Sequence, residues 1–178
     1  MASIDDVDDV SLNICWITVR KMGDLCSTTT RSLAKGLVDL GHNVILMNPD
    51  EKDAHKRFPW KHHSLNQSTW RGFQASSVSK SALGWFIQNP NISIDLILID
   101  WQLTKILAPA LKKMNYPLIL MDRSPPADVS LLGKLQWRQW RYAWKLVLDG
   151  EISSGCVVSN AHREFVQQKY SIPSNVIH

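Results

Sequence analysis

The sequence has few cysteines and no long uninterrupted apolar segment. Its 178 residues include three cysteines, Cys15, Cys26 and Cys156, which are odd in number and widely spaced. This spacing argues against a disulfide framework and a zinc site, so we expect free thiols, with Cys15 and Cys156 in strands. No apolar run approaches the roughly 18 residues of a membrane span, and the N-terminus is acidic where a signal peptide is basic. A cytoplasmic protein is expected.

The loop after the first apolar segment lacks the glycines of a dinucleotide-binding turn. Residues 12–19, LNICWITV, are apolar and rich in β-formers, and the following RKMGDLCSTTT contains only Gly23. A pyrophosphate cannot approach this backbone as it approaches a G-x-G-x-x-G turn, which disfavours a dinucleotide-dependent oxidoreductase. The hydroxyls of STTT keep open a flavodoxin-like or other nucleotide-binding module. A non-catalytic interaction domain is a further alternative.

Positive charge exceeds negative charge, and the excess lies outside the first ten residues. The chain carries 20 Lys and Arg against 16 Asp and Glu, for a formal net charge of +4. Four aspartates lie within residues 1–10, so the remaining chain carries +8. We expect residues 1–10 to be an acidic disordered leader and residues 11–178 to form a single basic domain with anionic partners.

Strand-like and helix-like segments alternate along the chain. Apolar runs predict strands at 12–19, 43–48, 94–100, 116–122 and 155–160, and helical periodicity predicts helices at 30–40, 77–88, 101–115, 127–148 and 161–170. Gly41 is expected to end the first helix, and Pro109 to interrupt or kink the third. Residues 50–67 are predicted to be a solvated basic loop, and 69–74 a short strand. Because the strands are uniformly apolar, the predicted fold is a Rossmann-like, doubly wound parallel α/β sheet.

In such a sheet, ligands bind beyond the carboxyl ends of the strands. The candidate positions are residues 20–28, Asn48, 100–102, 122–126 and 159–160. Structural interpretations stay open for several of them. Asp100 and Asp122 could cap the following helices, and Arg123 could pair with a nearby aspartate. His55, His62 and His63 lack the spacing of a metal site, so no metal is predicted.

Residues 134–147, KLQWRQWRYAWKLV, predict an amphipathic helix. At 100° per residue its cations occupy one sector and its tryptophans the neighbouring one. The helix could bury its tryptophans against the sheet, face an anionic membrane, or bind nucleic acid. Nucleic acid is disfavoured because no recognition motif accompanies the charge. The membrane interpretation assigns to the interface Lys134, Arg138, Arg141, Lys145, Trp137, Trp140 and Trp144.

The order of these motifs resembles the N-terminal half of a GT-B glycosyltransferase. The segments that carry the resemblance are LNICWIT, RSLAKGLVDLGHNVILMNP, DLILID, YPLILMDRSPP and GCVVSNAHREFVQQKYSIPSNVIH, which cover nearly the whole chain from residue 12. The closest resemblance is to the retaining, nucleotide-sugar-dependent group that includes glycogen and sucrose synthases (glycosyltransferase group 1, family 4-like). It implies an acceptor-binding domain, followed in the full-length enzyme by a donor-binding domain. Alone, the 178 residues are expected to be inactive.

The resemblance also implies roles for residues at the carboxyl ends. Asp100 would be an acceptor-hydroxyl ligand or catalytic base, and Arg123 would hold an anionic group. The implied acceptor-binding residues are Gly23, Asp24, Trp101, Arg123, Ser124, Ser159 and Asn160. No cofactor is expected in this domain, and the full-length enzyme would use a nucleotide sugar. The expected partners are a sugar acceptor, which could be lipid-linked, the donor domain and an anionic membrane surface on the inner face, but not nucleic acid.

Overall fold

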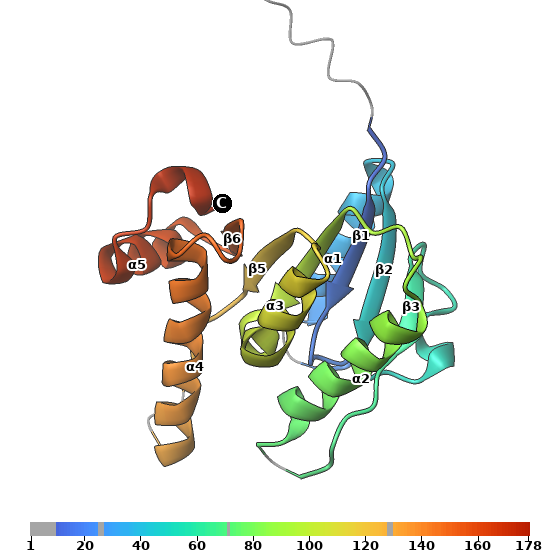
Figure 1. Cartoon of the computed structure of the whole chain (residues 1–178), viewed down its shortest axis with the longest axis horizontal. Helices are drawn as coiled ribbons and strands as arrows, with labels where there is room; N and C mark the ends of the chain where they lie inside the picture. Colours follow the sequence, from blue (N-terminus) through green and yellow to red (C-terminus); the bar gives the residue numbers. More distant parts are fainter. Residues whose placement is uncertain (1–9, 25–26, 71, 128–129) are drawn as a thin grey trace, which may run out of the picture.

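The computed structural model describes residues 10–24, 27–70, 72–127 and 130–178. Most of the expected acidic leader, and Cys26, lie outside them. Strands and helices alternate along the described chain (Figure 1). The strands are β1 (Asn13–Ile17), β2 (Asn43–Asn48), β3 (Lys61–Ser64), β4 (Leu96–Asp100), β5 (Leu118–Asp122) and β6 (Ser154–Val157). The α-helices are α1 (Ser27–Asp39), α2 (Gln74–Gln88), α3 (Thr104–Lys113), α4 (Leu131–Leu148) and α5 (Asn160–Tyr170). Short 3-10 turns are η1 (Lys52–His55), η2 (Trp101–Leu103) and η3 (Ser174–Val176).

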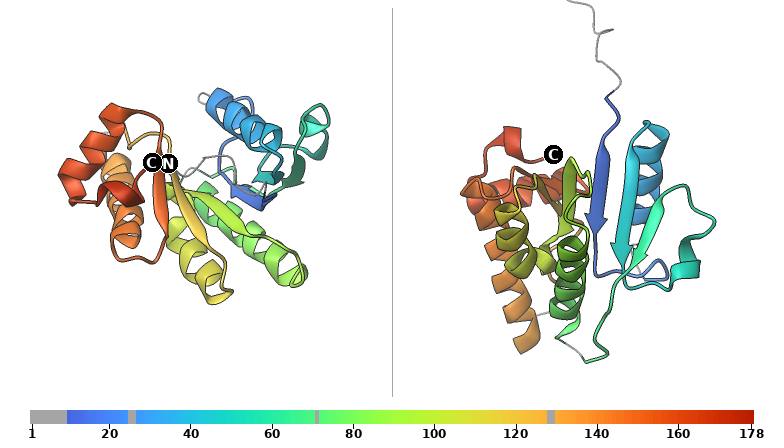
Figure 2. Two further views of the ribbon diagram at one scale, coloured as in Figure 1. Left: turned by 90° about the horizontal axis from the view of Figure 1, so that it is seen from above. Right: turned by 45° about the vertical axis from the view of Figure 1, so that its right-hand side comes forward.

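The strands form one parallel sheet with the order β3-β2-β1-β4-β5-β6. Helix α1 covers one face, and α2 and α3 cover the other (Figure 2). Each face of the sheet has its own apolar core, because Cys15 and Ile17 of β1 point to one face while Ile14 and Trp16 point to the other. The predicted doubly wound, Rossmann-like fold is confirmed. No helix among the described residues has the length and apolar character to cross a membrane.

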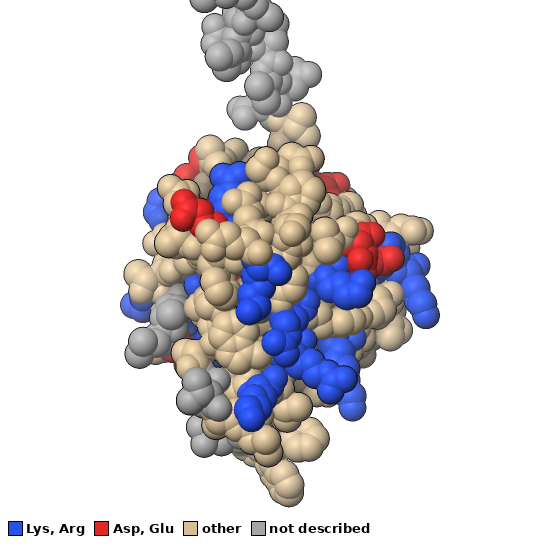
Figure 3. All heavy atoms as spheres, turned by 90° about the vertical axis from the view of Figure 1, so that its left-hand side faces the viewer, with Lys and Arg blue, Asp and Glu red and all other residues tan. Residues whose placement is uncertain are grey.

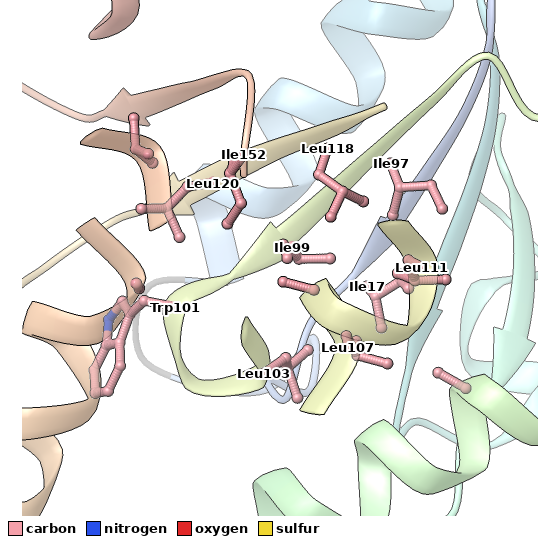
Figure 4. Packing of buried hydrophobic residues seen from close by; sticks show 14 of the residues in the cluster. Ile17, Ile97, Ile99, Trp101, Leu103, Leu107, Leu111, Leu118, Leu120 and Ile152 are labelled. Atoms are coloured by element: carbon pink, nitrogen blue, oxygen red, sulfur yellow. The ribbon is translucent and has the colours of Figure 1, made fainter. Parts of the chain in front are cut away.

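The core explains why the strands that are buried on both faces were predicted accurately. Figure 4 shows apolar side chains of β4, β5 and α3 pointing toward one another: Ile97, Ile99, Leu118, Leu120, Leu107 and Leu111. Strands buried on both faces require continuous apolar runs, which are visible in the sequence. Gly41 has a φ of 88° and follows the end of α1, as predicted. Cys15 and Cys156 lie in strands as free thiols, and burial raises the pKa of both.

Three local predictions were wrong. The expected basic loop at 50–67 contains η1 and the edge strand β3, which pairs with β2. The described residues of 69–74 form turns and the start of α2 rather than a strand. Helix α3 continues through Pro109, so the interruption predicted there is absent, whereas the alternative of a kink stays a prediction. The polar segment can pair at the sheet edge because an edge strand needs only one neighbour and little burial.

Gly155 in β6 lies against Trp144 of α4. A Cβ atom on Gly155 would lie 2.5 Å from Cη2 and Cζ3 of the fully buried Trp144 ring. Gly155→Ala is therefore expected to lower the free energy of unfolding by about 2 kcal/mol. Gly84→Ala in α2 is the matched control. Its Cβ would meet nothing within 4 Å, so it should raise that free energy by about 0.5–1 kcal/mol through helix propensity. Urea denaturation measures both, and a shift in the same direction would contradict this packing.

Candidate functional site

A buried ion pair lies at the carboxyl ends of β4 and β5. Arg123 Nη2 donates to Asp100 Oδ2 at 2.5 Å, and the Thr18 hydroxyl donates to the same oxygen at 2.6 Å. Arg123 Nη2 also donates to Thr18 Oγ1 at 3.0 Å, and Arg123 Nη1 donates to Thr30 Oγ1. The side chains of Asp100 and Arg123 are 2% and 8% exposed. One guanidinium thus joins the residue after β1, the start of α1 and the end of β4.

This pairing bears on the role predicted for Asp100. The structural alternative, in which Arg123 pairs with a nearby aspartate, is confirmed for Asp100. The Trp16 indole N–H lies 3.5 Å from the second carboxylate oxygen, Oδ1, and the guanidinium lies over the Trp16 ring. Asp100 does not hydrogen-bond from its side chain as a cap of η2. The cavity beside the pair, lined in part by Trp101 and Ser124, measures about 10 Å³ and holds at most one water. Asp100 therefore presents almost no surface to a ligand.

A much larger groove opens at the same edge of the sheet. It measures about 940 Å³ and lies between the loop after β1, the start of α2, η2 and the first turns of α4. Its described lining includes Arg20, Lys21 and Asp24 from the loop, and Trp101 and Leu135 from η2 and α4. This volume is in the range of small-molecule binding sites, and the location is where ligands bind in open α/β sheets.

The neutral polar lining of the groove is dominated by glutamine amides, of which the candidate positions from the sequence included only Gln102. The five glutamines come from four segments, namely the loop before α2, α2, η2 and α4: Gln67, Gln74, Gln102, Gln136 and Gln139. Two of them are anchored, because Gln67 donates to the Val19 carbonyl at 3.2 Å and Gln139 donates to the Gln102 carbonyl. Gln74 and Gln136 are exposed. Since an amide both donates and accepts, this lining suits a ligand rich in hydroxyl groups.

The other predicted site residues divide between the groove and the surrounding structure. Gly23 is exposed, and a Cβ there would meet nothing, so the loop does not need glycine for a close approach. Asp24 lines the groove and accepts the Lys21 N–H at 2.8 Å. The Ser124 carbonyl accepts the Trp101 indole N–H at 3.1 Å. Ser159 caps α5, and the described lining of the groove includes neither Ser159 nor Asn160.

A hydrogen-bonded chain at the end of β2 fixes the loop after β1. Trp60 Nε1–H donates to His55 Nδ1 at 3.0 Å, and His55 Nε2 lies 2.8 Å from Asp50 Oδ2. Because an indole N–H can only donate, His55 Nδ1 accepts from Trp60, and His55 Nε2–H donates to Asp50. Asp50 also accepts the Met22 N–H at 2.9 Å. Burial alone would raise the pKa of Asp50, but the hydrogen bonds from His55, Met22 and Asn48 lower it below its usual value.

The histidines of this segment were predicted to be solvated, and this was wrong for His55 and His62. His55 is 3% exposed, and the His62 ring stacks on it at 3.8 Å. Burial lowers the pKa of His62 to about 4. Burial also lowers the pKa of His63. In the described part of the chain, no group of three or more His, Cys, Asp or Glu residues is placed to hold a metal ion.

The membrane-facing assignment of Trp140 and Trp144 was wrong. Both are fully buried, and their indole N–H groups donate to Asp122 Oδ2 at 2.6 and 2.8 Å. His162 Nε2 lies 3.1 Å from the same oxygen, without hydrogen-bond geometry. Trp137 is half-buried against Trp140. The cause is Asp122 itself, because a buried carboxylate at a strand end needs donors, and α4 supplies two. The cations assigned to the interface are all exposed: Lys134, Arg138, Arg141 and Lys145.

Comparisons with known proteins identify the fold. No model of a protein family matches the chain, and no curated protein sequence matches it. A glycosyltransferase from Rickettsia africae matches with a TM-score of 0.61 and 16% identity, over 94% of this chain and 42% of its own. A UGT transferase from Siraitia grosvenorii, solved with UDP, matches with a TM-score of 0.61 and 12% identity, over 90% and 48%. A UDP-N-acetylglucosamine 2-epimerase matches with a TM-score of 0.57 and 9% identity, over 94% and 47%.

These matches concern half of each enzyme. The chain spans about half the length of the solved structures that it resembles. The identities are low, so the matches establish architecture and not activity, and the epimerase shows that one architecture serves more than one reaction. They also do not distinguish the retaining, group 1 enzymes from others. The chain has the fold of one Rossmann-like half of a GT-B glycosyltransferase.

Proposed function

We propose that this chain is the acceptor-binding half of a nucleotide-sugar-dependent glycosyltransferase. The observation that carries the proposal is the groove of about 940 Å³ at the carboxyl ends of the strands, with its lining of glutamine amides. A hydroxyl-bearing acceptor, whether glycan, glycolipid or glycoprotein, offers the donors and acceptors that such amides bind. The sequence motifs favour the retaining, group 1 type within this class.

The residues around the loop after β1 favour binding of the sugar acceptor, rather than the nucleotide-sugar donor, in this groove. A sugar diphosphate needs converging backbone N–H groups or uncommitted cations. Arg123 is committed to Asp100 and two threonines, and Gly23 opens no close approach. Arg20 and Lys21 are the cations in the described lining of the groove, but the carboxylate of Asp24 lies in the same lining and would repel a diphosphate. Donor binding is therefore assigned to a second Rossmann-like domain, which would close over the groove and supply the nucleotide sugar.

In this arrangement the residues of the chain hold the acceptor and shape its surroundings. The exposed amides of Gln74 and Gln136 orient acceptor hydroxyls from opposite sides of the groove. Asp100 acts through Arg123, because their ion pair fixes the loop after β1 and the start of α1. Asp50 and His55 hold the same loop from the other side through the Met22 N–H. Preorganisation of the acceptor reduces the entropic part of the barrier to transfer.

Replacing two groove amides tests the proposal. Gln74→Ala with Gln136→Ala should weaken the binding of a monoglycoside by about tenfold or more, because each lost hydrogen bond is worth about 0.5–1.5 kcal/mol. Titration of phenyl and alkyl glucosides, galactosides and mannosides, followed by NMR, identifies a ligand and its affinity. Gln88→Ala with Gln168→Ala, exposed glutamines outside the described lining, is the control. Equal affinities in both double variants would contradict the proposal.

A further inference from the structure

The exposed face of α4 is strongly cationic. Lys134, Arg138, Arg141 and Lys145 are all exposed, and they occupy the sector of the helix next to the one that carries the buried Trp140 and Trp144. Figure 3 shows the side of the molecule that carries α4, where Lys and Arg side chains form a band with few acidic neighbours. Lys145 pairs with Asp149 at 2.6 Å, at the C-terminal end of the helix. The charge excess therefore lies toward the N-terminal part of α4.

The same exposed face carries apolar side chains. Leu131 is 78% exposed, Leu135 is 59% exposed and Tyr142 is 38% exposed. At 100° per residue these three positions fall within about 40° of one another, directly beside the sector of the cations. Cations flanking an exposed apolar strip are typical of helices that lie in a membrane interface.

The exposed apolar side chains of α4 form one rim of the groove, and a second apolar rim lies across the groove from it. Trp70 and Phe73, just before α2, are 75% and 62% exposed, and with Lys80 they line a hollow of about 460 Å³. Leu135 of α4 and Ala75 of α2 line the same groove. Figures 1 and 2 show the starts of α2 and α4 projecting on one side of the molecule, beyond the carboxyl ends of the strands. The groove thus opens between two apolar rims.

We propose that these two rims and the cationic face of α4 dock on an anionic lipid bilayer. Leu131, Leu135, Trp70 and Phe73 enter the interface, and the cations of α4 contact lipid phosphates. The deeper tryptophans cannot take part because they hold α4 to Asp122. The mouth of the groove then faces the bilayer, so its ligand is an acceptor carried on a lipid. This last statement about substrate class rests on the proposed function, whereas the docking does not.

Charge complementarity makes the bilayer the best-matched occupant. Each Lys or Arg near an anionic surface contributes about 1 kcal/mol, which corresponds to about a fivefold gain in partition. The four cations are spread along an 18-residue helix, which suits a planar array of phosphates. The phosphates of nucleic acid would also attract these cations, but a nucleic-acid backbone would not bury the exposed leucines on the same helix face.

Co-sedimentation of the chain with vesicles tests the docking. The vesicles are phosphatidylcholine with phosphatidylglycerol, or phosphatidylcholine alone, and contain no glycolipid and no nucleotide. We expect binding to the anionic vesicles only, weakened by high salt. Arg138→Gln with Arg141→Gln should weaken vesicle binding about 25-fold, because each of the two lost cations accounts for about a fivefold change in partition. Lys52→Gln with Lys61→Gln removes two exposed cations near the opposite edge of the sheet and should change binding by less than about twofold.

The apolar part of the surface needs its own variants. Leu131→Ser with Leu135→Ser, and Trp70→Ser, alter exposed side chains, so folding should be preserved, and both should reduce vesicle binding. Binding unaffected by these changes, or equally weakened by the Lys52 and Lys61 control, would overturn the proposal. Binding to duplex DNA, measured by fluorescence anisotropy, without binding to anionic vesicles would also overturn it. Because the vesicles carry no acceptor, failure here leaves monoglycoside binding in the groove a separate result.

Discussion

Replacing Arg123 with methionine is expected to lower the free energy of unfolding by about 3–5 kcal/mol, because it leaves a buried carboxylate without its cation. Asp100 is 2% exposed, and Arg123 and Thr18 both donate to its Oδ2 atom. The same substitution removes the hydrogen bond to Thr30 in α1. Urea denaturation, followed by far-UV circular dichroism, measures the change.

A double variant separates the buried charge from the lost packing. Asp100→Asn with Arg123→Met removes both charges, so it should be more stable than Arg123→Met alone. Arg138→Met, on the exposed face of α4, is the matched control and should change the free energy of unfolding by less than about 0.5 kcal/mol. A single Arg123→Met variant as stable as the wild-type chain would show that the ion pair does not form as described.

Replacing Asp122 with alanine should destabilise the chain by at least about 2 kcal/mol, since each buried donor left without a partner costs about 1–3 kcal/mol. Two such donors, the indole N–H groups of Trp140 and Trp144, point at Asp122 Oδ2. Asp122→Asn keeps one carbonyl oxygen in place and should cost less. Urea denaturation gives the free energies, and near-UV circular dichroism reports the tryptophan packing.

The control for Asp122 is an exposed aspartate at the C-terminal end of α4, the helix that carries the two tryptophans. Asp149 pairs with Lys145 across one helical turn, and both are exposed. Asp149→Ala is expected to cost less than about 1 kcal/mol. If Asp122→Ala costs no more than Asp149→Ala, the two tryptophans do not depend on Asp122, and the account of why they turn away from solvent is wrong.

The parts of the fold that are buried on both faces could be predicted from the sequence. Strand β2 was predicted with its observed bounds, because NVILMN contains the apolar run VILM and lies between helix-ending Gly41 and Pro49. Strand β3 could not be found in this way. Its residues, KHHS, are polar because the strand lies at an edge of the sheet. The side chain of His62 hydrogen-bonds to Asn48 and stacks on His55, and neither contact can be read from the pattern of the strand itself.

The tryptophans of α4 show a second limit. Helical spacing placed Trp137, Trp140 and Trp144 on one face, and that face exists. Spacing cannot tell a core-facing stripe from a membrane-facing one, because both are apolar. The deciding partner, Asp122, lies 18 and 22 positions away in the sequence. The alternative in which the tryptophans cover the sheet was correct for two of the three, and the membrane proposal now involves other side chains of the same helix.

The sequence predicted the position of the groove at the strand ends, but it did not identify all of the residues that line the groove. The rule that ligands bind at the carboxyl ends of parallel strands points to the loops after β1 and β4, and both line the groove. The rule says nothing of helix side chains, so Gln74 in α2 and Gln136 in α4 were missed. Both are polar residues at exposed helix positions, and only the approach of the two helices across the groove gives them a common role.

One measurement tests the acceptor assignment most directly. The amide spectrum of the ¹⁵N-labelled chain is recorded with UDP-glucose and, separately, with the monoglycoside that binds best. We expect the glycoside to shift the resonances of groove residues such as Gln74, Gln102 and Gln136, and UDP-glucose at the same concentration to leave them unchanged. Shifts of the loop after β1 by UDP-glucose, without any response to glycosides, would contradict the account and would make the chain a donor-binding or other nucleotide-binding domain.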